Sequence, residues 1–155
     1  MKLLAKVRFA RLWIMLLFTS LSMVPVSTVA FAVSIGEQYQ GGIVFYVDES
    51  RQHGLIAATR DLPGEYEWQG AKEACERFVH GGFSDWYLPS RWELNQLYMH
   101  KNAVAGFPDG YSYYWSSSEA KASAGNAWGQ NFSNGNQGQD GKASINVRVR
   151  AVRAF

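Results

Sequence analysis

The stretch Asp85-Trp-Tyr-Leu-Pro-Ser-Arg-Trp-Glu-Leu94 carries the clearest local structural signal in the chain. Within it, Pro89 precedes Ser90, and Glu93 lies three residues after the serine, which is the Ser-x-x-Glu capping box of a helix start. Apolar residues with helical spacing follow the box. The sequence therefore predicts a short helix that begins at Ser90 and ends near His100.

A second short helix is predicted upstream, over residues 69–80. Its apolar face is formed by residues at i, i+3, i+4 and i+7, namely Ala71, Ala74, Cys75 and Phe78. The pair Gly81-Gly82 is expected to end this helix, because glycine readily adopts the left-handed conformation of a helix C-terminus. Between the two helices, three residues are expected to anchor the junction in the core: Trp86, Leu88 and Pro89.

Strand signals flank the two helices. Residues 43–47 and 55–58 are β-rich runs separated by a polar turn, and they predict a hairpin. Three later runs also have strand character: residues 113–117, 127–132 and 145–151. Asn134-Gly135 is a tight-turn signal, and the last run alternates apolar with polar residues, as half-buried strands do. These elements predict an α+β fold, with a twisted, mostly antiparallel sheet, two short helices and long loops.

The first 32 residues have the three parts of a secretory signal peptide. A basic segment precedes an uncharged apolar run over residues 12–24, and Ala30-Phe-Ala32 fits the small-residue cleavage pattern. Cleavage there would leave residues 33–155 as a single mature domain. The alternative is an uncleaved anchor, the one case in which a membrane contact is expected. Both interpretations export the domain, to the periplasm, the cell surface or the medium.

Subtraction of this leader changes the charge of the chain. Four of the 15 lysines and arginines lie in the leader, which leaves 11 basic against 13 acidic residues and a net charge near −2. The charge of the mature domain therefore does not favour a basic surface that binds nucleic acid, and no nucleic acid partner is expected. Cys75 is the only cysteine, so no intrachain disulfide is possible. Its position on an apolar helix face predicts a small buried hydrophobe rather than a nucleophile.

Six short motifs occur in a defined order along the chain. They are Gly41-Gly-Ile-Val-Phe-Tyr46, His53-Gly-Leu-Ile-Ala-Ala58, Asp85-Trp-Tyr-Leu-Pro-Ser90, Glu93-Leu94, Tyr114-Trp-Ser-Ser-Ser-Glu119 and Val147-Arg-Val-Arg150. The set resembles the bacterial exported domain family typified by the C-terminal domain of the Legionella collagen-like adhesin. The resemblance spans residues 36–153. It implies a C-type-lectin-like fold, in which two helices and a twisted antiparallel sheet support a long loop region, and it implies glycan binding.

Two of these motifs are expected to serve the structure itself. In the fifth motif, alternation sends Trp115 to one face of a strand and Ser116 to the other, and the hydroxyls of Ser116 and Ser117 can satisfy backbone groups of neighbouring loops. In the sixth, two arginines are candidates for an internal ion pair with Glu119: Arg148 and Arg150.

The candidate ligand site is the polar segment from Gly125 to Gly141. Its candidate residues are Trp128, Asn131, Asn134, Asn136, Gln137 and Asp140. Aromatic rings can stack on the apolar face of a sugar, and planar amides offer both donors and acceptors to its hydroxyls. The alternative interpretation is a polar hairpin without a ligand. Calcium is a further alternative, because oxygen-rich loops bind it, but Asp140 is the only carboxylate in the segment, so no metal site is predicted.

These observations favour an exported, non-catalytic binding module over an enzyme. The three histidines lack metal-ligand spacing: His53, His80 and His100. Formylglycine-generating oxidases have a fold related to that of the resembled family, but their copper-thiol chemistry needs cysteines that this chain lacks. The expected ligand is an extracellular glycan or a cell-surface protein, with no cofactor. The alternative is an envelope-associated structural or protein-interaction domain without glycan binding.

Overall fold

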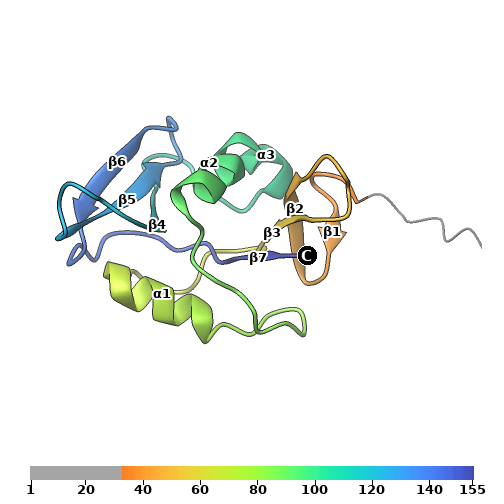
Figure 1. The fold of residues 1–155 in the computed structure, drawn as a ribbon, viewed down its shortest axis with the longest axis horizontal. Coiled ribbons are helices and arrows are strands. Elements are labelled where there is room, and N and C mark those ends of the chain that lie inside the picture. Colours follow the sequence, from red (N-terminus) through yellow and green to blue (C-terminus); the bar gives the residue numbers. More distant parts are fainter. Residues whose placement is uncertain (1–32) are drawn as a thin grey trace, which may run out of the picture. The chain divides into compact units, whose positions relative to one another are not determined.

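The computed structural model describes residues 33–155, and the predicted signal peptide, residues 1–32, lies outside the described residues (Figure 1). The elements in order are β1 (Gln38–Tyr39), β2 (Gly42–Val47), β3 (Gly54–Ala57), α1 (Trp68–Glu76), α2 (Arg91–Met99), α3 (Lys101–Val104), β4 (Tyr113–Glu119), β5 (Asn126–Asn131), β6 (Gln137–Gly141) and β7 (Val152–Ala154). Within residues 33–155, none of the helices has the length and apolar character needed to cross a membrane.

The strands form two antiparallel sheets, with orders β1-β2-β3-β7 and β4-β5-β6. The predicted α+β class is confirmed, whereas the expectation of one sheet is wrong. The predicted hairpin over residues 43–58 is also confirmed as β2 and β3, with Val44 opposite Ile56. All four residues of β3 are buried, because this strand lies between β2 and β7 and is covered on both faces.

The two faces of the first sheet pack into two hydrophobic clusters. Val44 and Ile56 belong to the cluster that contains α1, and Phe45 belongs to the cluster that contains α2 and α3. This division follows the alternation of side chains along a strand. Figure 1 shows α1 on one side of the sheet and α2 with α3 on the other. Trp86 and Trp115 fill the first cluster, with 2% and 0% of their surfaces exposed.

Helix α1 is shorter than predicted, because it ends at Glu76 rather than near His80. Gly81 and Gly82 do not end it. They form the tight turn of a small backbone loop in which His80 and Phe83 exchange hydrogen bonds of 3.0 Å. Both glycines have positive φ, +61° and +84°, as a turn of this tightness requires. The glycine pair therefore forms a tight turn, and the prediction that it ends the helix is wrong.

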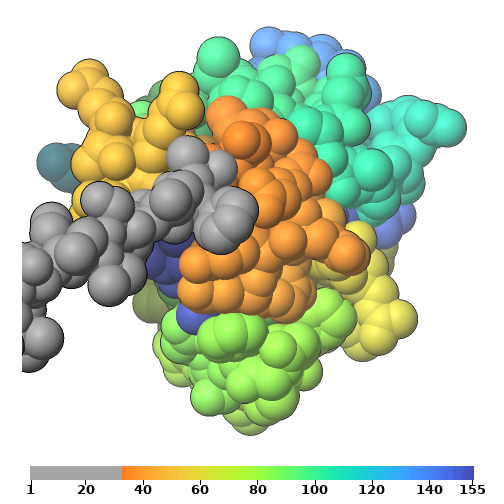
Figure 2. All heavy atoms as spheres, turned by 90° about the vertical axis from the view of Figure 1, so that its right-hand side faces the viewer, coloured from red at the N-terminus to blue at the C-terminus, as the bar shows by residue number. Residues whose placement is uncertain are grey.

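Gly81 also makes a close backbone contact with the first sheet. The backbone of Gly81 packs directly against Gly41 in the turn between β1 and β2, where a side chain would collide with the Gly41 backbone. Figure 2 shows this face, with the β1–β2 segment in orange above the light green segment that follows α1.

Helix α2 begins and ends as predicted. The Ser90 hydroxyl accepts a hydrogen bond from the Glu93 amide at 3.3 Å, and the Glu93 carboxylate accepts one from the Ser90 amide at 2.7 Å. Both halves of the capping box are therefore formed, and His100 is the C-terminal cap. The single-turn helix α3 follows at once and was not predicted.

The expected strand over residues 145–151 is wrong in its bounds. Regular pairing is limited to β7, and the residues before it run extended beside β4, where Arg148 exchanges backbone hydrogen bonds with Tyr113 and Trp115. The alternation also fails at two positions. Ile145 is 62% exposed, whereas Arg150 is 1% exposed. Arg150 can be buried because its charge finds partners inside the protein, as described below.

Candidate functional site

The β5–β6 hairpin divides the candidate ligand residues between its two faces. Trp128 lies opposite Gln139, and the neighbouring pair is Ala127 with Asp140. Because neighbouring residues in a strand point to opposite faces, Trp128 and Gln137 share the face toward α2, while Asn131 and Asp140 lie on the other. The last two candidates, Asn134 and Asn136, lie in or beside the turn that joins the strands.

The asparagines of the turn are occupied by local hydrogen bonds. The side-chain oxygen of Asn131 accepts from the amide of Ser133 at 2.9 Å and from its hydroxyl at 2.7 Å. The side-chain oxygen of Asn134 accepts from the amide of Asn136 at 2.9 Å. Such bonds shape the turn, as asparagine commonly does. Asn131 is also buried. These acceptors therefore support the turn of the hairpin.

Trp128 and Gln137 meet the first residue of α2. The guanidinium carbon of Arg91 lies 3.5 Å from the centroid of the Trp128 ring. Its Nε donates to the Gln137 side-chain oxygen at 2.8 Å, and the Gln137 amide nitrogen donates to the Arg91 backbone carbonyl at 3.1 Å. Stacking and two hydrogen bonds thus fix the guanidinium plane on the ring. One face of Trp128 is therefore covered by Arg91.

A buried amide below this contact sets the distance between helix and hairpin. Gln130 is fully buried, and its amide nitrogen donates to the Asn95 side-chain oxygen at 2.9 Å and to the Gly135 carbonyl at 3.1 Å. A buried amide is costly unless it is bonded in this way. Gln130 therefore specifies one position of α2 on β5 and β6.

Trp92 is the exposed aromatic residue of this surface. Its side chain is 51% exposed, and its ring stands nearly perpendicular to that of Tyr46, with 5.0 Å between centroids. Six residues line a groove of about 420 Å³ here, which we call the α2 groove: Ser90, Arg91, Trp92, Asn95, Ser118 and Gln137. Only Gln137 was among the candidate ligand residues. Trp92 could have been found from the sequence, because its position lies outside the apolar face that Leu94 and Leu97 form. An aromatic residue at such a position does not pack in the core.

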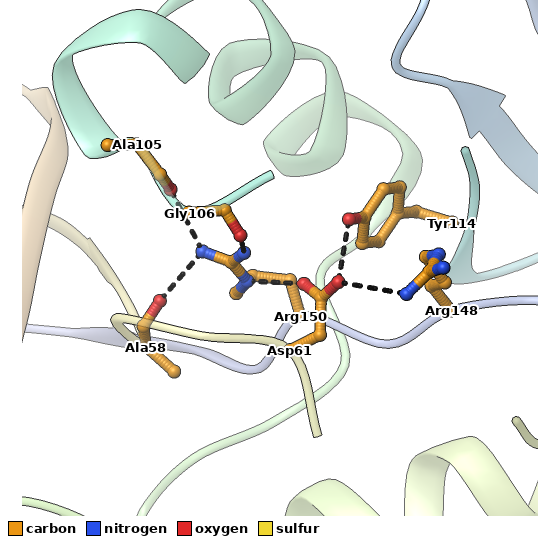
Figure 3. A network of polar contacts seen from close by, with 7 residues as sticks. All are labelled: Ala58, Asp61, Ala105, Gly106, Tyr114, Arg148 and Arg150. Carbon is orange, nitrogen blue, oxygen red and sulfur yellow. Dashed lines mark hydrogen bonds and ion pairs between the residues drawn. The ribbon is translucent and has the colours of Figure 1, made fainter. Parts of the chain in front are cut away.

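A polar network holds the segment that follows α3 (Figure 3). The Arg150 side chain is fully buried, and its Nε donates to the Asp61 carboxylate at 2.7 Å. The rest of its guanidinium donates to three backbone carbonyls, those of Ala58, Ala105 and Gly106. Tyr114 donates its hydroxyl to the other oxygen of Asp61 at 2.8 Å. The network joins β4, the segment after β3 and the loop after α3.

The charges of this network differ from the expected pairing. Asp61 pairs with both arginines, because Arg148 also approaches its carboxylate, at 3.7 Å. Glu119 instead pairs with Lys142 at 2.7 Å. The expected ion pair between Glu119 and an arginine is therefore wrong. Burial, and next the negative charge of Asp61, raise the pKa of Tyr114 above its usual range, so this hydroxyl stays protonated.

The serines of β4 satisfy backbone groups near the α2 groove. The Ser116 hydroxyl donates to the Trp128 carbonyl at 2.8 Å and accepts from the Ser118 amide at 3.3 Å. The Ser117 amide donates to the Pro89 carbonyl at 2.8 Å. The hydroxyl of Ser116 therefore satisfies backbone groups of β4 and β5, and the Ser117 amide, rather than its hydroxyl, ties β4 to the segment before α2.

Comparison of the sequence with known protein families identifies the family of this chain. The Lcl C-terminal domain family matches residues 47–153. The chain belongs to the Lcl C-terminal domain family. This confirms the resemblance drawn from the six motifs, although the first of them precedes the matched range. Lcl C-terminal domains are associated with exported, adhesin-like proteins. A comparison with curated proteins found no match.

Every residue of the α2 groove lies within the Lcl C-terminal domain match. So does Cys75, which is fully buried on α1. Burial, with a smaller contribution from the charge of Glu76, raises the pKa of its thiol to about 12, so the thiol is protonated at neutral pH. Across residues 33–155, His, Cys, Asp and Glu side chains nowhere gather in a group of three that could hold a metal ion.

Proposed function

We propose that this chain is an exported, non-catalytic binding module that recognises an extracellular glycan through the α2 groove. The observation that carries the proposal is Trp92. It is a large aromatic side chain, half exposed, held edge-on by Tyr46 and surrounded by polar groups. Exposed aromatic rings in such settings are typical of binding surfaces, because they offer wide contact area at little entropic cost.

The polar rim of the groove has the chemistry that sugar hydroxyls require. Arg91 and Gln137 hold one another in place, and Ser90 and Ser118 are fixed by backbone hydrogen bonds. A ring stacked on Trp92 would therefore meet amide, hydroxyl and guanidinium groups whose positions are already set. Binding to groups fixed in advance costs less ordering entropy than binding to mobile ones. Trp128 supports the site from below, through its contact with Arg91.

We also propose that the domain has a C-type-lectin-like fold, and the strand order supports this. The first and last strands belong to one sheet, and the α2 groove lies between α2 and residues of the second sheet. Two short helices pack on opposite sides of this arrangement. A non-catalytic role is supported by Cys75, because a buried thiol with a pKa near 12 is a poor nucleophile. Export is supported by the family and by the predicted signal peptide.

A glycan array with purified protein tests the proposal. We expect the wild type to bind at least one glycan class, with and without a chelator. Trp92→Ala should weaken that binding about tenfold or more, because it removes the stacking ring. Trp128→Ala should also weaken it, because Arg91 loses its support. Met99→Ala is the matched control, since Met99 is 64% exposed on the same helix but outside the groove.

Each outcome is interpreted only for variants whose thermal unfolding matches the wild type. Unchanged glycan binding in folded Trp92→Ala contradicts the α2 groove as the site. Binding to no glycan contradicts the glycan part of the proposal. Loss of binding on chelation shows a metal-dependent site, which contradicts the expectation of none.

A protein-interaction domain is the second candidate, and one observation favours it. Trp92 and Met99 lie seven residues apart on α2, about two helical turns, so these two exposed apolar side chains face the same side of the helix. A partner protein could cover both. Here Met99→Ala should reduce partner binding as Trp92→Ala does, whereas glycan recognition leaves the Met99 variant unaffected.

A further inference from the structure

The opposite face of the β5–β6 hairpin carries a second hollow that the α2 groove does not include. Its volume is about 380 Å³, and the lining residues that concern its chemistry are Tyr111, Tyr113, Asp140, Ser144 and Ile145. We call it the Tyr111 hollow. Ile145 is 62% exposed at its rim, so apolar surface is presented to solvent here.

Two tyrosine rings form an aromatic platform in the Tyr111 hollow. The rings of Tyr111 and Tyr113 are almost parallel, at 9°, with 6.5 Å between their centroids. Tyr111 is 76% exposed. Tyr113 is held in place because its ring lies over Gly129 and Gly138, where any side chain would approach it closely. The platform is therefore accessible on one side and fixed on the other.

Asp140 supplies a negative charge whose orientation is set. Its Oδ1 accepts hydrogen bonds from the Gly141 amide at 2.8 Å and from the Ser144 hydroxyl at 3.0 Å. Its Oδ2 accepts none from residues 33–155. Burial, and next the charge of Asp140, raise the pKa of Tyr113 to about 12.

The cations nearest in sequence are engaged elsewhere. Lys142 pairs with Glu119 at 2.7 Å, and Arg148 pairs with Asp61 at 3.7 Å. Among the described residues that line the Tyr111 hollow, none is a lysine or an arginine. The hollow therefore combines exposed aromatic faces with a carboxylate that has no cationic partner within it.

We propose that the Tyr111 hollow binds a small organic ammonium ion. The carboxylate of Asp140 would pair with the positive charge, and the faces of the tyrosines would attract it through their quadrupoles. Methyl or methylene groups of the ion would contact Ile145. This site is independent of the α2 groove, where the guanidinium of Arg91 opposes a cation.

Choline and its uncharged isostere 3,3-dimethylbutan-1-ol form the test, because they differ in charge and hardly in shape. Each is titrated into the protein while the ring protons of Tyr111 and Tyr113 are followed by NMR. We expect saturable shifts with choline in the millimolar range and binding of the alcohol about three- to tenfold weaker. Glucosamine and glucose repeat the comparison for a cationic and a neutral sugar.

Two variants and one control complete the test. Asp140→Asn keeps an oxygen for Gly141 and Ser144 but removes the charge, and should reduce choline binding to the level of the alcohol. Tyr111→Ala should weaken choline binding about two- to fivefold. Glu49→Gln removes an exposed carboxylate from the β2–β3 turn and should change nothing. Equal binding of choline and the alcohol, or unchanged choline binding in Asp140→Asn, overturns the proposal. Choline-induced shifts at Trp92 instead of the tyrosines overturn it as well.

Discussion

Replacement of Arg150 by methionine should be among the most destabilising single changes in this protein. Methionine keeps much of the length of the side chain but removes the guanidinium, whose carbon lies 4.0 Å from the Phe107 ring centroid. The change leaves the Asp61 carboxylate without its closest cation. It also leaves three carbonyls without their donor, those of Ala58, Ala105 and Gly106.

The magnitude follows from burial. The Arg150 side chain has no exposed surface, and that of Asp61 is 16% exposed. Removal of one partner from a buried ion pair typically costs about 3–5 kcal/mol. We expect a loss near the lower end, about 3 kcal/mol, because Asp61 keeps the Tyr114 hydroxyl and Arg148. For a domain of this size, that loss lowers Tm by roughly 10–15 °C.

Arg148 is a matched control, because it approaches the same carboxylate from two residues away. Its side chain is 43% exposed and its nitrogen lies 3.7 Å from Asp61. Exposed pairs contribute at most about 1 kcal/mol, so Arg148→Met should cost no more than this. Equilibrium unfolding in urea gives both free energies. A loss for Arg150→Met that is no larger than the loss for Arg148→Met would refute the reasoning.

Three further predictions concern the cap, acid stability and the thiol. Ser90→Ala should lower the free energy of unfolding by about 1 kcal/mol in urea, because the α2 capping box is lost; an unchanged value would show that the box is dispensable. The hydrogen bond from Arg153 lowers the pKa of Asp85 in the folded protein. The Asp85–Arg153 contact therefore stabilises the fold fully above the unfolded-state pKa of Asp85, near 4, and this stabilisation is lost as pH falls through the lower folded-state pKa. Urea unfolding at pH 6 and pH 2.5 should therefore show a smaller acid loss in Asp85→Asn than in the wild type, by less than about 1 kcal/mol because Asp85 is exposed. Cys75 should react with a thiol reagent only as fast as the protein unfolds, and rapid labelling in native buffer would contradict its burial.

The parts of the fold that depend on neighbouring residues could be predicted from the sequence. The α2 capping box is a bond between Ser90 and Glu93, three positions apart, so its pattern is complete in the sequence. The β2–β3 hairpin likewise needs only two strands and a turn. The early end of α1 could not be predicted, because Phe78 leaves the helix to pack on Trp86, at 5.8 Å between centroids. Both residues lie in the irregular segment between α1 and α2, so no helical or strand spacing indicates their contact.

The candidate site shows the same limit. The polar composition of the β5–β6 hairpin was visible, but its division between two faces follows from the strand register that puts Ala127 opposite Asp140. Arg91 stacks on Trp128 across 37 positions of sequence, and Gln130 bonds to Asn95 across 35. Contacts of this range leave no spacing pattern. The exposed Trp92 is the exception, since its place on the polar face of α2 could have been noticed.

The strand order β1-β2-β3-β7 has a practical consequence for how the domain can be handled. The described chain enters the first sheet at one edge and leaves it at the other, whereas the α2 groove and the Tyr111 hollow belong to the β4–β6 sheet (Figure 1). A linker or fusion partner joined at Val33 or Phe155 is therefore anchored through the sheet that carries neither recess. Tandem copies, or copies attached to beads by one end, should keep both recesses open to solvent.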